Sequence, residues 1–309
     1  MRKTSLNMVY EFAKRDSRVV FIGSDLGAGT LDQFRAEMPD RFFMEGVSEA
    51  NIIGMAAGLA SEGRIVYVST LAVFLTRRAY EQVALDICMH NLNVRLIGTG
   101  GGLVYAPLGP THMATDDFAL MRALPNMTVL APADAPEMRR LMVLVRDHAG
   151  PVYIRLGKGN EPDITSDMAP VTLGEAVRVR EGADALIITT GVTLHAAIPA
   201  AQILARGGCA AGIVHCPTVK PLDSEALAAA IDRVPVVVVV EEHVPAGGLG
   251  SAVAELIAQR TWDGRKRFQR IGLPDAFPDR YGSQAELLQW YGITKESIAA
   301  TVKTLAETP

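Results

Sequence analysis

Short apolar runs alternate with helical patterns along this chain. Runs rich in β-branched residues predict buried strands, and apolar residues that recur every three to four positions predict helices between several of them. In the first half, the predicted strands are residues 19–23, 65–69, 94–98, 128–131 and 152–156. The helices predicted there are residues 50–61, 77–90, 116–123 and 135–147. This βαβα order predicts a mainly parallel sheet covered by helices on both faces.

The rhythm breaks at residues 157–170, where Gly, Asn, Pro, Asp and Ser predict a linker. A second series of alternating strands and helices follows. Its predicted strands are 185–190, 210–215, 234–241 and 268–271, and its helices are 194–205, 224–231, 251–261 and 295–305. We therefore expect an α/β protein of two domains, residues 1–164 and residues 165–309, each a mainly parallel sheet flanked by helices.

Composition excludes several classes of partner. Of the 309 residues, 49% are hydrophobic and 21% are charged, as in a well-packed globular protein. The net charge of −4 and the lack of long basic runs argue against nucleic acid or an anionic membrane as partner. Cys88, Cys209 and Cys216 are odd in number and lack a CxxC spacing, which favours reduced thiols and a cytoplasmic protein.

A glycine-rich segment after one predicted strand invites comparison with dinucleotide-binding loops. The run from Gly98 to Gly102 would need a glycine at position 103, where Leu103 stands, and a helix directly afterwards. Pro107 and Pro110 instead keep the chain irregular. We therefore expect this loop to bring its backbone close to some other ligand.

Glu49 is an acid at the start of a predicted helix whose next eleven residues, Ala50 to Ala60, carry no charge. A carboxyl group packed among apolar residues is poorly solvated and holds or shares a proton more readily. A structural explanation is also open, because acids are common in the first turn of helices and Ser48 suits the N-cap position.

Five further segments connect Glu49 to a known family. The chain resembles transketolases and 1-deoxyxylulose-5-phosphate synthases in segments that keep the family's order and spacing: Arg41–Glu49, Ser69–Gln82, Gly109–His112, Leu124–Asp134, Gly157–Asn160 and Pro217–Leu222. The resemblance covers essentially the whole chain. It implies a thiamine-diphosphate pyrimidine-binding fold followed by the transketolase C-terminal fold.

One family motif is missing. Complete transketolases carry an N-terminal domain in which a Gly-Asp-Gly motif and a downstream Asn hold Mg²⁺ and the cofactor's diphosphate, and no Gly-Asp-Gly occurs here. The chain is therefore similar to the smaller subunit of a split transketolase, laid out like the β subunits of 2-oxo-acid dehydrogenases. The resemblance implies a larger partner subunit that supplies most of the ligands of Mg²⁺, and no metal ligands in this chain. It also implies self-association into an α2β2 assembly.

The resemblance assigns roles to residues that match the cofactor motif. Glu49 matches the glutamate that shares a proton with ring nitrogen N1′ of the thiamine diphosphate aminopyrimidine. Phe74 matches the aromatic residue that stacks on that ring, although an aromatic side chain that only fills the core is an alternative. Leu71 replaces a second aromatic residue, and Asp25 matches an acid at the subunit interface near the cofactor.

Other matching residues concern the sugar substrate. His112 matches a histidine that contacts donor hydroxyls and transfers protons, a role that suits imidazole chemistry. Lys158 stands where the family usually has a phosphate-binding arginine, and Lys lacks the bidentate geometry of Arg. Arg2 matches another such arginine less specifically, since ordinary surface pairing explains it equally well. Leu108 and Gly100 replace polar sugar contacts, so the substrate stays open among ordinary, branched, deoxy and sulfo sugars.

The resulting hypothesis is a transferase that moves a two-carbon glycolaldehyde unit from a ketose to an aldose, with thiamine diphosphate and Mg²⁺. Three alternatives stay open: a 2-oxo-acid dehydrogenase β subunit, a deoxyxylulose-phosphate-synthase-like enzyme, and a non-catalytic regulatory subunit. The Gly-Pro-Thr-His motif at residues 109–112 argues against the dehydrogenase. A purely regulatory subunit would need neither Glu49 nor His112.

Overall fold

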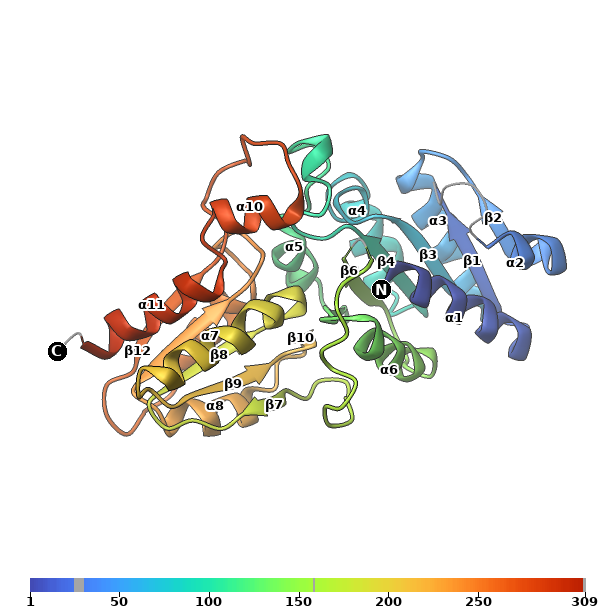
Figure 1. Cartoon of the computed structure of the whole chain (residues 1–309). Coiled ribbons are helices and arrows are strands. Elements are labelled where there is room, and N and C mark those ends of the chain that lie inside the picture. The colour runs from blue at the N-terminus through green and yellow to red at the C-terminus, as the bar shows by residue number, and fades with distance from the viewer. Residues whose placement is uncertain (25–30, 158, 308–309) are drawn as a thin grey trace.

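The computed structural model describes residues 1–24, 31–157 and 159–307. In these residues the strands form two sheets, one built mainly from the first half of the chain and one from the second (Figure 1). Helices flank both sheets. The predicted fold class, two α/β domains with mainly parallel sheets, is confirmed.

The first sheet has seven strands in the order β10-β5-β6-β4-β3-β1-β2. Six of them pair in parallel, and β10 from the second half joins the edge antiparallel to β5. The strands are β1 (Val19–Gly23), β2 (Phe42–Met44), β3 (Ile65–Leu71), β4 (Val94–Thr99), β5 (Thr128–Leu130), β6 (Val152–Leu156) and β10 (Thr218–Lys220). Their central members are buried on both faces, as the apolar runs predict.

Two helical layers cover this sheet. α1 (Arg2–Arg15) and α6 (Ala135–Arg146) pack on one face around a core that includes Phe21 and Ile154. α3 (Glu49–Ser61) and α5 (Asp117–Ala123) contribute to the core on the other face. The shorter elements are α2 (Asp32–Glu37), η1 (Pro39–Arg41), α4 (Tyr80–Gln82) and η4 (Ala106–Leu108).

The helix expected over residues 77–90 differs from the prediction. It begins earlier, with a π-helical turn η2 (Phe74–Arg78), continues through α4, and ends in a second π-helical segment η3 (Val83–Cys88). The apolar spacing that indicated a helix does not distinguish α from π turns. Wide turns of this kind shift the direction of the side chains that follow and are frequent at functional sites.

The second sheet has five strands in the order β12-β11-β8-β9-β7, parallel except for β7. They are β7 (Val177–Arg180), β8 (Ala185–Thr189), β9 (Ala211–His215), β11 (Val236–Val240) and β12 (Arg267–Ile271). The helical elements are η5 (Gly191–Thr193), α7 (Leu194–Arg206), α8 (Ser224–Asp232), α9 (Leu249–Ala258), α10 (Gln284–Trp290) and α11 (Lys295–Glu307). α7 and α11 share a core on one face, while α8 and α9 lie on the other.

The segment between β6 and β7 returns to the first sheet before the second begins. Ile164 and Thr165 donate backbone N–H bonds of 2.7 Å each to the Asp134 carboxylate at the start of α6. The predicted division between residues 164 and 165 falls in this segment and stays a prediction. One apolar core continues from the first sheet into the second, from Val129 to Leu186 and Val214, so the two halves are packed together.

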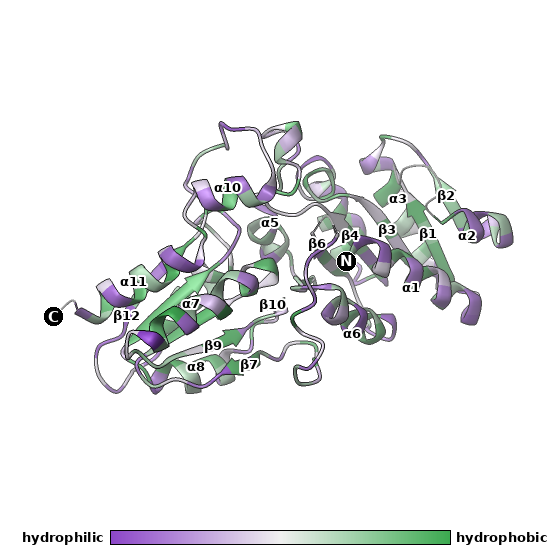
Figure 2. Ribbon diagram, in the orientation of Figure 1, coloured by the Kyte–Doolittle hydropathy of each residue, from purple (hydrophilic) through white to green (hydrophobic). Residues whose placement is uncertain are grey.

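Hydropathy follows this layout. In Figure 2 the strands are mostly green, and purple residues are distributed over the surrounding helices. Within the described ranges, no helix combines the length and apolarity that a membrane crossing requires. Cys88 and Cys216 are buried, Cys209 is half-buried, and all three are free thiols.

Candidate functional site

Glu49, Phe74 and His112 lie beyond the carboxyl ends of three parallel strands of the first sheet, in which β1 separates β2 from β3. Glu49 begins α3 after β2, Phe74 follows β3, and His112 follows β4 by way of η4. Ligands of open α/β sheets bind in the crevice at this edge. The topology therefore brings together side chains that are up to 63 positions apart in the sequence.

The Glu49 carboxylate is almost completely buried, with 1% of the side chain exposed. Burial next to Ile52 and Ile53 confirms the poorly solvated environment expected from the uncharged helix. Ser48 occupies the N-cap position, but its hydroxyl donates to the carbonyl of Glu45 at 2.9 Å and makes no capping bond. The capping role that the sequence favoured for Ser48 is therefore wrong, and the site holds an acid at an uncapped helix start.

Phe74 is half-buried and links the other predicted residues. Its ring lies edge-on to the imidazole of His112, with 5.4 Å between the centroids and 68° between the planes. Leu71 and Phe74 pack against a small apolar cluster of Ala72, Val73 and Ala114. Leu71 and Phe74 thus belong to one apolar cluster, and the role of Leu71 as an apolar wall for the cofactor stays a prediction.

Arg78 is part of this cluster and was missed from the sequence. Its Nη1 donates to Oε2 of Glu49 at 2.6 Å, and its Cζ lies 4.1 Å from the centroid of the Phe74 ring. The spacing from Phe74 to Arg78 was an available signal, because residues four apart on a helical turn share a face.

The neighbouring loop positions His112. Its backbone N–H donates to Gly109 at 3.0 Å, and its Nδ1 lies 2.9 Å from the hydroxyl of Thr111. The half-buried imidazole is thus held through Nδ1, with Nε2 as the nitrogen suited to a ligand. Arg77 in η2 makes a separate ion pair, in which its Nε donates to both carboxylate oxygens of Asp116 at 3.0 Å.

The glycine loop is shaped by side chains from elsewhere. Gly100 has φ +78°, and a Cβ added there would lie 2.0 Å from the ring of Tyr105. A Cβ on Gly101 would lie 2.2 Å from Nε of the buried Arg155. Leu108, the other departure from the family pattern, is 52% exposed. The space that a polar residue would need at position 100 is therefore already filled.

Arg2, which is expected to bind an anion, does not lie with Glu49 and His112, and two other predicted residues cannot be placed. Arg2 stands at the start of α1 beside a cavity of about 590 Å³, which Gly159 and Asn160 also line. Neither Glu49 nor His112 lines this cavity. Asp25 and Lys158 lie outside the described residues. Among residues 1–24, 31–157 and 159–307, no group of three or more His, Cys, Asp or Glu is placed to hold a metal ion.

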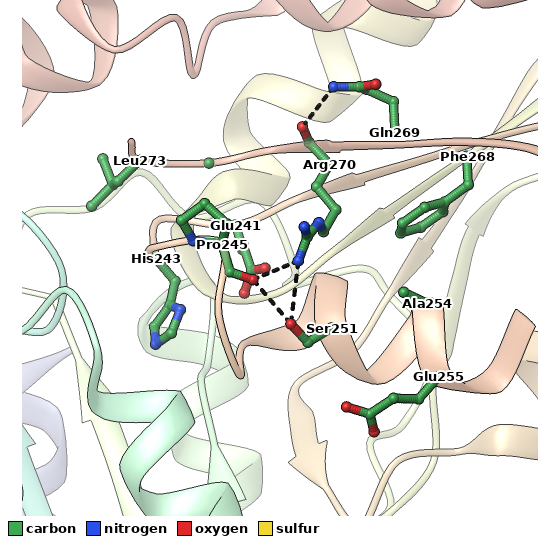
Figure 3. Close-up of a pocket in the computed structure, with 11 residues that line it drawn as sticks. Glu241, His243, Pro245, Ser251, Ala254, Glu255, Phe268, Gln269, Arg270 and Leu273 are labelled. Atoms are coloured by element: carbon green, nitrogen blue, oxygen red, sulfur yellow. Dashed lines mark hydrogen bonds between the residues drawn. The ribbon is translucent and has the colours of Figure 1, made fainter. Parts of the chain in front are cut away.

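A larger cavity, of about 750 Å³, lies in the second half of the chain between β12 and α9. In Figure 3 the Arg270 side chain points toward Ser251 and Pro245, and its Nη1 donates to the carbonyl of Pro245 at 2.6 Å. The carboxylate of Glu241 accepts the backbone N–H groups of Leu249 and Gly250. These polar groups are engaged within the protein. The Glu49 cluster instead combines a buried acid, a half-buried aromatic ring and an imidazole.

Comparison with known families agrees with this geometry. Residues 1–163 match the transketolase pyrimidine-binding domain, and residues 174–298 match the transketolase C-terminal domain. Together the two matches cover most of the chain.

Individual relatives are similar over nearly their full length. A 6-deoxy-6-sulfo-D-fructose transketolase subunit from Clostridium sp. (strain MSTE9) is 36% identical over 308 residues, which are 99% of this chain and 94% of that protein. An apulose-4-phosphate transketolase subunit from Phocaeicola vulgatus is 34% identical over 302 residues, 97% of this chain and 95% of that protein.

A solved structure shows the same fold. The structure described as a split gene transketolase, inactive beta4 tetramer, superposes with a TM-score of 0.88 at 34% identity. The match covers 99% of this chain and 97% of that one. The chain therefore belongs to the transketolase family and contains its pyrimidine-binding and C-terminal domains.

Proposed function

We propose that this chain is the smaller subunit of a two-chain transketolase, which transfers a glycolaldehyde unit from a ketose to an aldose with thiamine diphosphate and Mg²⁺. The observation that carries the proposal is the buried Glu49 carboxylate, which Arg78 connects to the ring of Phe74, with His112 packed against the same ring. Family membership and the names of similar subunits support it.

The Glu49 cluster fits an aminopyrimidine. A planar, hydrogen-bonding group, the guanidinium of Arg78, already contacts both the ring of Phe74 and the carboxylate of Glu49. A flat heteroaromatic ring that donates to an acid requires the same two partners. When bound, thiamine diphosphate supplies an electron sink for cleavage of a bond next to a carbonyl group.

Each residue of the cluster has a separate task in this proposal. The Glu49 carboxyl exchanges a proton with the pyrimidine nitrogen from a site that excludes water. The face of Phe74 fixes the plane of that ring, and Leu71 supplies an apolar wall. His112, held through Nδ1 by Thr111, presents Nε2 to the hydroxyl groups of the donor sugar and moves their protons.

A partner chain completes the site in this proposal. The sequence lacks Gly-Asp-Gly, so the larger subunit contributes the ligands of Mg²⁺ and of the diphosphate. Beside Glu49 the chain exposes Met44 (40%) and Val47 (75%), and the neighbouring Gly54 and Gly58 on α3 are open to solvent. An apolar surface of this kind next to a site is typical of a subunit contact. We propose an α2β2 assembly.

The substrates are proposed to be sugars with an anionic end. The relatives named above act, by their names, on a sulfonated fructose and on a sugar phosphate. Arg2, which lines the cavity of about 590 Å³ together with Lys3, is proposed to bind such a group, and so is Lys158, which lies outside the described residues. Leu108 in place of an acid argues against a donor that depends on a hydrogen bond there.

Reconstitution tests the proposal. The purified chain alone is expected to be inactive, and addition of a larger subunit with the Gly-Asp-Gly motif should produce glycolaldehyde transfer that requires thiamine diphosphate and Mg²⁺. Full activity of the chain by itself contradicts the two-chain proposal. Pyruvate in place of the ketose is the second donor to be tested, because its use identifies a synthase-like enzyme instead.

The Glu49→Gln variant tests the central residue. Glutamine keeps the size of the side chain and can still accept the bond from Arg78, but it has no acid proton to exchange. Turnover of the reconstituted complex should fall by about 10²–10⁴-fold while the subunits still assemble. Glu62→Gln, at the exposed end of the same helix, is the matched control and should retain activity. Wild-type exchange of the cofactor's C2 proton in Glu49→Gln contradicts the assignment.

A further inference from the structure

Arg78 occupies the space that the proposed function assigns to a ligand. The guanidinium group lies between the carboxylate of Glu49, 2.6 Å from its Nη1, and the ring of Phe74, 4.1 Å from its Cζ. Non-bonded heavy atoms approach to about 3.5–4.0 Å at their optimum. The guanidinium is therefore in direct contact with the ring, and no second planar group fits between them.

We propose that Arg78 holds the place of the cofactor's aminopyrimidine in the free chain and must swing outward before the cofactor can bind. This inference rests on the proposed function, because it takes Glu49 and Phe74 as the residues that receive the pyrimidine. A ring that stacks on Phe74 and also reaches Glu49 must use the ring face that looks toward Glu49. Arg78 covers that same face and bonds to that same carboxylate.

The two side chains of this ion pair differ in how freely they can move. The side chain of Arg78 is 46% exposed, whereas that of Glu49 is 1% exposed and fixed in the first turn of α3. Arg78 can therefore rotate into solvent without repacking of the core. Glu49 cannot follow it, so the position of the carboxylate is the same before and after the exchange.

The ion pair between Arg78 and Glu49 also stabilises the free chain. A buried carboxylate with no partner is strongly unfavourable, and a guanidinium that can be displaced compensates it until a ligand arrives. The face of Phe74 is covered at the same time by a cation–π contact. Arg78 is accordingly a positioning residue: it holds the Glu49 side chain in place through their hydrogen bond, and it competes with the cofactor.

Cofactor affinity in the reconstituted complex is the direct test. Arg78→Gln removes the competing charge, so the complex should bind thiamine diphosphate about tenfold more tightly, as expected when a charge-assisted bond no longer has to be broken. Titration calorimetry or the quenching of protein fluorescence measures the dissociation constant without reliance on turnover. Arg78→Lys keeps the charge without the planar group and should give an intermediate value.

Arg77→Gln is the matched control. Arg77 precedes Arg78 on the same turn but pairs with Asp116, so its replacement should change the dissociation constant by less than about twofold. Unchanged or weaker binding in Arg78→Gln overturns the inference, and so does a structure of the loaded complex in which Arg78 still contacts both partners. If the complex binds the cofactor tightly and replacement of Arg78 does not change the dissociation constant, only this inference is wrong and the proposed function is retained. A complex in which no variant binds the cofactor overturns both.

Discussion

At the scale of single residues, the candidate site separates two kinds of polar chemistry. Glu49 is buried and tied to one movable cation, whereas His112 is half-buried at the edge of the Phe74 ring and held by its neighbour Thr111. The first arrangement suits proton exchange with a bound ring in the absence of water. The second suits contact with a substrate that enters from solvent.

This separation predicts the behaviour of His112→Ala. In the proposed function, exchange of the cofactor's C2 proton would depend on Glu49 and not on His112, so its rate should stay within about threefold of the wild type. Because His112 is proposed to move substrate protons, kcat/KM for the donor ketose should fall by about 10²-fold or more. Proton exchange followed by NMR and steady-state kinetics measure the two effects. His90→Ala, at an exposed position, is the control, and equal loss in both assays contradicts the prediction.

Residue patterns revealed part of this site. Glu49, Phe74 and His112 could be found because each stands in a motif that keeps its spacing. Arg78 stands in such a motif too, yet its contact with Glu49 joins residues 29 positions apart, and local spacing does not report such contacts. The expected cap at Ser48 failed for a related reason: its hydroxyl found the carbonyl of Glu45, an alternative that Ser side chains commonly take.

At the scale of elements, the start of α6 connects the two halves of the chain. Asp134 caps the helix by accepting the N–H of Glu137 at 2.9 Å, and it also accepts the hydroxyl of Thr165 at 2.6 Å. Backbone N–H groups of Ile164 and Thr165 complete four bonds to one buried carboxylate. Burial alone raises the pKa of Asp134, but these hydrogen bonds outweigh it and hold the pKa below its ordinary value of 3.8.

The Asp134→Asn variant should lose stability. An amide NH₂ group would face backbone donors that need an acceptor, at a cost of about 1–3 kcal/mol in the free energy of unfolding. Because the folded pKa is lowered, the carboxylate stabilises the fold above pH 3.8 and loses this effect as the pH falls below it. The difference in the free energy of unfolding between Asp134→Asn and the wild type should therefore become smaller at low pH, as measured by urea titrations.

Asp232→Asn provides the comparison for this experiment. Asp232 ends α8 with a side chain that is 55% exposed, and its cation partner Lys266 lies 3.9 Å away. Its replacement should change the free energy of unfolding by less than about 0.5 kcal/mol. A deficit of Asp134→Asn that matches this control would show that the cap does not stabilise the junction.

At the scale of the whole molecule, a buried carboxyl group joins the glycine loop to the second half of the chain. Glu242 accepts the N–H of Leu103 at 2.8 Å and the side-chain amide of Gln284 at 2.9 and 3.1 Å. Burial raises the pKa of Glu242 above 4.5, and the nearby Asp117 acts in the same direction, whereas the Arg155 charge opposes it. The loop that leads from β4 to His112 is thus linked to α10 through Glu242.

Glu242 makes the stability of this junction depend on pH. Above pH 4.5 the folded chain binds more protons at this position than the unfolded chain. The contribution of Glu242 to the free energy of unfolding therefore falls as the pH rises through the raised pKa of the folded state. Glu242→Gln cannot titrate and can still accept from Leu103. Its stability relative to the wild type should therefore increase as the pH rises above 4.5, as measured by urea unfolding at each pH.

Glu242→Ala is the contrasting variant. It leaves the N–H of Leu103 without its acceptor, so it should lose about 1–3 kcal/mol at every pH. If Glu242→Gln and Glu242→Ala showed the same loss and no dependence on pH, the carboxyl group would not be the link between loop and α10.

Sequence patterns determined the fold class, both sheets and most of their strands, because buried parallel strands must be apolar along their whole length. They also determined the family and predicted three residues of the candidate site, because the spacing of a motif can be read directly from the sequence. Tertiary structure alone decided the π-helical turns, the attachment of β10 to the first sheet and the roles of Arg78 and Glu242. Those features depend on groups that meet only after the chain has folded, and their free energy comes from burial and hydrogen bonds between distant positions.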